Sequence, residues 1–78
     1  MALYNENNQK DRFRTEQLIL RFIREHGAIT VKECASVLDV FDQEAYFELE
    51  RMTRRGRLKK VFAEGKNIYF PTRTGQFR

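Results

Sequence analysis

The sequence predicts an α+β fold, in which three helices are followed by a β-hairpin. Before residue 56, apolar residues recur at three- and four-residue spacing in three segments, as in helices that bury one face. After residue 56, two short runs rich in β-branched and aromatic residues flank a glycine-containing turn. A chain of 78 residues holds one domain, and 41% hydrophobic content is enough for a small core.

The first helix is expected to begin near Asp11 and to end at Gly27, which adopts the left-handed conformation of helix ends readily. Its apolar stripe would consist of Leu18, Ile19, Phe22 and Ile23. The opposite, solvent-facing side would carry Arg14, Glu16, Gln17, Arg21, Arg24 and Glu25. Residues 1–12 are polar and rich in asparagine, so we expect a partly disordered, flexible arm before a domain over residues 13–71. Residues 72–78 would form a short basic tail.

A capping box predicts the second helix. Thr30 stands at the N-cap position and Glu33 follows three residues later, so that each side chain can bond to the other residue's backbone. The buried face of this helix would carry Val31, Cys34, Ala35 and Leu38. Asp39 suits a tight turn after it, because aspartate tolerates the left-handed region better than most residues.

A third helix is predicted from about Asp42 to Arg55, closed by Gly56, with Ala45, Leu49 and Met52 buried. The hairpin follows, with strands over 58–62 and 67–70 and a turn over 63–66. Pro71 ends the second strand, since proline has no N–H to donate to a neighbouring strand. Two helices joined by a short turn, with a hairpin directly after the second, form the winged helix-turn-helix arrangement.

The stretch Thr30 to Val40, TVKECASVLDV, resembles the helix-turn of bacterial helix-turn-helix regulators through Ala35, Leu38 and Val40, with Asp39 where glycine is usual. The segment from Ala45 through Gly56 to Tyr69-Phe70 resembles the small FaeA/PapI-like winged-helix regulators of fimbrial operons. The resemblance covers roughly residues 15–71. It implies a bacterial, cytoplasmic transcription regulator that binds double-stranded DNA, as a dimer or together with another regulator.

The resemblance implies that the third helix enters the major groove and that the hairpin touches the DNA backbone or the minor groove. The net charge of +4 suits a polyanionic partner. The predicted DNA-binding residues are Gln43, Phe47, Arg51, Arg54, Arg55, Arg57, Lys59, Lys60 and Lys66, of which the first three are the candidates for base contacts. If six phosphates were engaged, affinity would fall about as the fifth power of the salt concentration.

An alternative function is an adaptor that binds a protein partner or a second copy of itself. The front of the third helix departs from the pattern of DNA readers, because it carries the carboxylates of Asp42, Glu44, Glu48 and Glu50, which repel phosphates. Phe41 and Phe47 either pack inward against Leu38 and Phe22 or form an aromatic patch with a carboxylate rim. The protein-binding residues would then be Phe41, Asp42, Glu44, Phe47 and Glu48.

Catalytic, metal and cofactor sites are not expected. Cys34 is the only cysteine and is interpreted as a small buried hydrophobe, while His26 has no metal-ligating companion at a suitable spacing. The chain has no phosphate-cradling glycine loop and no hydroxyl with a neighbouring base. No apolar run reaches the roughly 20 residues of a membrane span, and the first residues do not read as a signal peptide.

Overall fold

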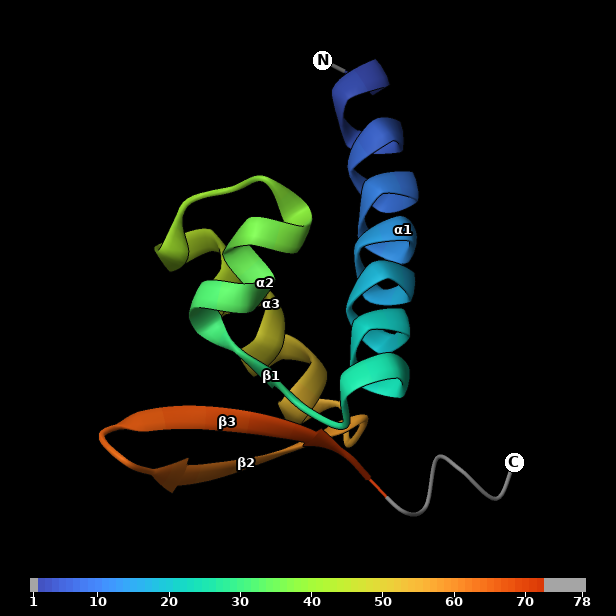
Figure 1. Ribbon diagram of the computed structural model, residues 1–78. Helices are drawn as coiled ribbons and strands as arrows, with labels where there is room; N and C mark the ends of the chain where they lie inside the picture. The colour runs from blue at the N-terminus through green and yellow to red at the C-terminus, as the bar shows by residue number, and fades with distance from the viewer. Residues whose placement is uncertain (1, 73–78) are drawn as a thin grey trace.

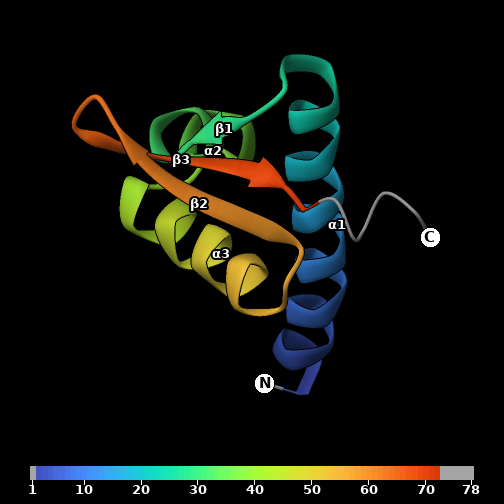
Figure 2. The ribbon, with the colours of Figure 1, turned by 90° about the horizontal axis from the view of Figure 1, so that it is seen from below.

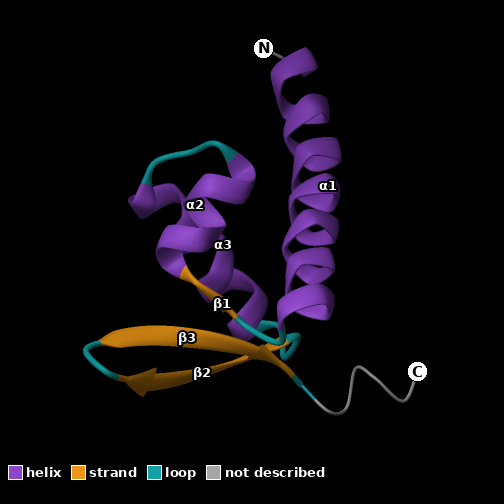
Figure 3. Ribbon diagram, viewed as in Figure 1, coloured by secondary structure: helices purple, strands orange, loops and turns teal. Residues whose placement is uncertain are grey.

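The computed structural model describes the backbone of residues 2–72 and the side chains of residues 13–72. Within this part of the chain the fold is α+β, with three helices and one three-stranded antiparallel sheet (Figures 1 and 3). The elements, in order, are α1 (Ala2–His26), β1 (Ile29–Thr30), α2 (Val31–Leu38), α3 (Asp42–Arg54), β2 (Leu58–Ala63) and β3 (Lys66–Pro71). This architecture is compatible with a winged helix.

The sheet has the strand order β1-β3-β2, so the central strand is the last in the chain. Tyr69 of β3 lies opposite Ile29 on one side and opposite Lys60 on the other. The helices gather on one side of the sheet, and the β2–β3 hairpin extends beyond them (Figures 1 and 2). The sequence predicted the hairpin correctly but not the pairing of β1 with β3, since two residues give no periodicity by which a partner can be chosen.

One core joins the helices and strands. The buried apolar residues are Ile19, Ile23, Ile29, Cys34, Ala35, Ala45, Leu49, Met52, Leu58 and Tyr69. The predicted buried residues of α3 are confirmed, while Val31 and Leu38 of α2 and Leu18 and Phe22 of α1 are only half-buried. The α1 stripe is therefore centred on Ile19 and Ile23, which are 0% and 3% exposed.

The predicted turn signals are also confirmed. In the capping box, the Glu33 N–H donates to Thr30 Oγ1 at 3.2 Å, and the Thr30 N–H donates to Glu33 Oε1 at 3.0 Å. Asp39 ends α2 in the left-handed conformation, with φ of 59°. The hairpin turn consists of Glu64 and Gly65, both with positive φ, which matches the right-handed twist of the two strands.

The first helix begins earlier than expected, at Ala2 instead of near Asp11, so the backbone of residues 2–12 is helical. The sequence up to residue 26 contains neither proline nor glycine. Once the segment around Ile19 and Ile23 is docked, each added residue gains one hydrogen bond without a new nucleation cost. The N-terminal turns extend past the loop between α2 and α3 (Figure 1). Residues 73–78 of the expected basic tail lie outside the described residues.

Glu16 is a second correction. The sequence places it on the solvent face of α1, but the residue is only 6% exposed. Glu16 precedes Ile19 by three residues and Ile23 by seven, so it lies on the same helical face as these core residues. Burial of a carboxylate at this position requires partners, which the end of α3 and the segment after it supply.

Candidate nucleic-acid interface

The outer face of α3 is the predicted reading surface. Ala45, Leu49 and Met52 face the core, so the side turned furthest from it carries Gln43, Phe47 and Arg54. All three are exposed. Two predicted base-contact residues, Gln43 and Phe47, are therefore accessible on one helical face.

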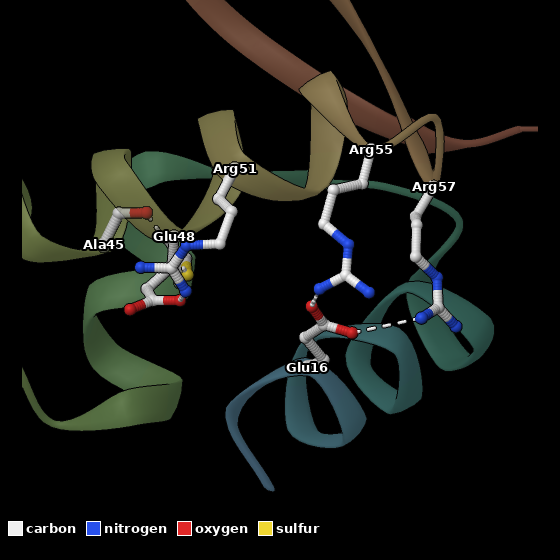
Figure 4. Close-up of polar contacts among 7 residues, drawn as sticks. Glu16, Ala45, Glu48, Arg51, Arg55 and Arg57 are labelled. Carbon is white, nitrogen blue, oxygen red and sulfur yellow. Dashed lines mark hydrogen bonds and ion pairs between the residues drawn. The ribbon is translucent and has the colours of Figure 1, made fainter. Parts of the chain in front are cut away.

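The third predicted base-contact residue, Arg51, has an intramolecular partner. Its Nη1 donates to Glu48 Oε1 at 2.7 Å, and both side chains are partly buried (Figure 4). Asp42, at the start of the helix, forms an exposed ion pair with Lys32 at 3.2 Å. Part of the negative charge at the front of α3 is thus neutralised, and this lessens the repulsion of a polyanion that the sequence led us to expect.

Glu16 holds two of the predicted phosphate-binding cations. Arg55 Nη1 donates to Glu16 Oε2 at 3.0 Å, and Arg57 Nη1 donates to Glu16 Oε1 at 3.1 Å. Figure 4 shows both guanidinium groups reaching from the segment that follows α3 to this carboxylate on α1. The two arginines keep 54% and 42% of their side chains exposed. This cluster ties α1 to α3 and satisfies the buried carboxylate.

Glu50 holds a third predicted cation. Its Oε2 accepts from Lys60 Nζ at 2.8 Å and from the buried Tyr69 hydroxyl at 2.7 Å. The hydrogen bond from Lys60 holds the pKa of Glu50 below its usual value, against the opposing effect of burial. Burial and the hydrogen bond to Glu50 raise the pKa of Tyr69, so its hydroxyl remains a proton donor. The cluster fastens the hairpin to α3.

Three predicted DNA-binding cations stay exposed without an ion pair to any other side chain of residues 13–72. They are Arg54 at the end of α3, Lys59 in β2 and Lys66 at the start of β3. The structure therefore divides the predicted cations into a free group and a group held by carboxylates of the same chain.

Sequence reasoning missed Glu16 and Glu50 as the carboxylates that hold these cations, and Tyr69 as the hydroxyl that donates to Glu50. For Glu16 a signal exists, since its spacing extends the stripe of Ile19 and Ile23 by one turn. For Glu50 and Tyr69 no local signal exists. Their contact joins residues 19 positions apart across a helix and a sheet.

The aromatic residues at the front of α3 do not pack into the core. Phe41 is 83% exposed and Phe47 is 55% exposed. Tyr46 contacts Phe47 with a ring-centroid distance of 5.9 Å. Of the two possibilities that the sequence left open, the structure shows the exposed aromatic patch.

The remaining reactive groups lie away from this surface. Cys34 is fully buried in the core, as predicted, and burial raises the pKa of its thiol to about 12. His26 is exposed and its ring lies 4.3 Å from that of Phe22. Among the residues described, no three histidine, cysteine or carboxylate side chains are grouped so as to hold a metal ion. No helix among the described residues is both long enough and apolar enough to cross a membrane.

Comparison with known proteins gives no relative. No family model matches the chain, and neither a curated protein nor a solved structure matches it at a significant level.

Proposed function

We propose that the protein is a small winged-helix regulator of transcription that binds double-stranded DNA. The observation that carries the proposal is the group of free cations at Arg54, Lys59 and Lys66, on the end of α3 and on the hairpin that follows it. Cations at the end of this helix and on the following hairpin suit contacts with the phosphates of a duplex whose major groove holds the helix.

The exposed face of α3 supports the same function. The amide of Gln43 can donate to and accept from an adenine edge, and the ring of Phe47 can contact a thymine methyl group. Glu50 and Lys60 fix the hairpin relative to α3 through their hydrogen bond, so the two DNA-contacting elements would approach a duplex as one unit. A fixed relative position lowers the ordering cost of binding.

The number of cations that are free to contact phosphates determines how strongly the protein is expected to bind DNA. Three phosphate contacts give a slope of log affinity against log salt of about −2.7, whereas the seven predicted cations together would give about −6. With three contacts, affinity falls roughly 40-fold when salt rises fourfold. We therefore expect weak binding by a single copy, and a shallower salt dependence than the sequence alone predicts.

The experiment is a salt titration of fluorescence anisotropy with a labelled duplex of random sequence. The native protein should bind with a slope near that of three phosphates. Lys59→Glu/Lys66→Glu should lose most of the binding. Arg21→Glu/Arg24→Glu changes the net charge equally on the exposed side of α1, and should bind nearly as the native protein does. Equal binding by the two variants, or no binding by the native protein at low salt, would show the proposal to be wrong.

A second candidate function is protein binding through the front of α3. The observation that favours it is the exposure of Phe41 and Phe47, at 83% and 55%, beside the carboxylates of Asp42 and Glu44. Exposed aromatic side chains within a polar rim are typical of protein interfaces. Phe41→Ala/Phe47→Ala would then abolish association with a protein partner and leave the circular dichroism spectrum unchanged. A variant that still associates would contradict this function.

A further inference from the structure

A groove runs between α1 and the front of α3, and part of its lining is apolar. The groove has a volume of about 550 Å³. The apolar lining residues are Leu18 of α1, Leu38 at the end of α2, Val40 just after α2, and Phe47 of α3. None of these four is fully buried, so the core leaves an apolar strip uncovered on this side of the molecule.

The two edges of the groove carry opposite charges. Arg14 lines it from α1, and Glu44 lines it from α3. Both side chains are exposed, and neither forms an ion pair within residues 13–72. The other charged residues of the lining, Glu48 and Arg51, neutralise each other at 2.7 Å. The groove therefore combines a free positive charge on α1, a free negative charge on α3 and a group of apolar side chains.

We propose that a second copy of this chain docks on this groove in a two-fold arrangement. This deepens the second candidate function, because it names the partner. In a two-fold interface, if residue i of the first copy contacts residue j of the second, then residue j of the first copy contacts residue i of the second. A copy rotated about an axis over the groove brings its Glu44 to Arg14 of the first copy, and its Arg14 to the first copy's Glu44.

The apolar part of the lining fits the same arrangement. Phe47 projects from α3 beside Leu18, Leu38 and Val40, so a rotated copy can insert its phenyl ring over the leucines of the first. An aromatic anchor at the centre with charged residues at the rim is the composition of stable protein interfaces. An unrelated partner of one charge would satisfy only one edge of the groove, whereas a second copy satisfies both.

The dimer covers Phe47, one of the two proposed base-contact residues, but leaves Gln43 and the three free cations accessible. Arg54, Lys59 and Lys66 do not line the groove. Two copies would thus present two sets of free cations, and this offsets the weak binding expected from one.

The test is sedimentation equilibrium of the full chain without DNA, so that its outcome does not depend on DNA binding. The native protein should show a monomer–dimer equilibrium. Phe47→Ala should raise the dimer dissociation constant by at least about tenfold, as expected for a central aromatic anchor. Phe62→Ala is the matched control, since Phe62 is 71% exposed but lies outside the groove lining, and it should leave the constant unchanged.

A charge exchange tests the two-fold pairing itself. Arg14→Glu and Glu44→Arg should each weaken the dimer at least about tenfold, since the symmetry places the like-charge contact in the interface twice. The double variant Arg14→Glu/Glu44→Arg should restore it. Both positions are exposed, so folding is not at risk. A monomeric native chain, a double variant no better than the single ones, equal effects of the two phenylalanine variants, or assemblies larger than a dimer would each overturn the proposal.

Discussion

Replacement of Glu16 by glutamine tests the role of the buried carboxylate in holding α1 against the end of α3. In the native protein the Glu16 side chain is 7% exposed, and its carboxylate accepts hydrogen bonds from Arg55 and Arg57 at 3.0 and 3.1 Å. Glutamine has nearly the same shape, but only one of its two terminal atoms can accept. The variant therefore loses one hydrogen bond and the attraction between opposite charges, with little change in packing.

The expected magnitude follows from the exposure of the partners. A hydrogen bond to a charged group contributes about 1.5–3 kcal/mol, but water screens an exposed pair to about 0–1 kcal/mol. Here the carboxylate of Glu16 is buried while the arginine side chains are 54% and 42% exposed. We therefore expect Glu16→Gln to lower the free energy of unfolding by about 1–2 kcal/mol. For a domain of this size that corresponds to a Tm decrease of about 5–15 °C.

The assay is urea and thermal unfolding followed by circular dichroism. The matched control is Glu25→Gln on the same helix, whose exposed contact with Arg21 has a length of 3.9 Å and should contribute almost nothing. If Glu16→Gln unfolds at the same urea concentration as Glu25→Gln, the carboxylate does not stabilise the docking of α1. The distinction between free cations and cations held by Glu16 would then have no support from stability.

Three further outcomes are expected. Lys60 and Tyr69 hold the pKa of Glu50 down, so the native protein should be more stable than Glu50→Gln by the full amount above about pH 4.3. This difference should vanish as the pH falls through the lowered pKa of Glu50. Urea unfolding at neutral and acidic pH measures the difference, and a constant value would contradict the prediction. The thiol of Cys34, with its pKa raised to about 12, should resist iodoacetamide in the native protein and react rapidly in urea; rapid native labelling would show the site to be open. Asp39→Gly should raise the unfolding free energy by about 0.5 kcal/mol, since φ of 59° strains most side chains, and a loss of stability in thermal unfolding would refute this.

Local signals made much of the fold predictable. The capping box of Thr30 and Glu33, the left-handed Asp39 and the turn at Gly65 all act within a few residues, so the sequence shows them directly. The helical spacing of Ala45, Leu49 and Met52 likewise predicted the buried face of α3. The start of α1 was mispredicted because polar, asparagine-rich composition indicates little helical preference, whereas a docked helix continues until something stops it.

Local signals could not predict which cations are free and which are paired with a carboxylate of the same chain. Whether Arg55 and Arg57 are free depends on Glu16, about 40 positions earlier, and whether Lys60 is free depends on the packing of the hairpin against α3. Such pairings arise from tertiary structure and leave no spacing in the sequence. A run of basic residues therefore predicts that a surface is positively charged, but not how many of its cations are free to contact a partner.

The most direct test of the proposed function is the change in amide chemical shifts when the ¹⁵N-labelled protein is titrated with a short DNA duplex. Binding as proposed predicts that the largest changes fall on Gln43, Arg54, Lys59 and Lys66, with small changes over Arg21 and Arg24 of α1. Changes spread evenly over the molecule, or confined to the groove between α1 and α3, would contradict it.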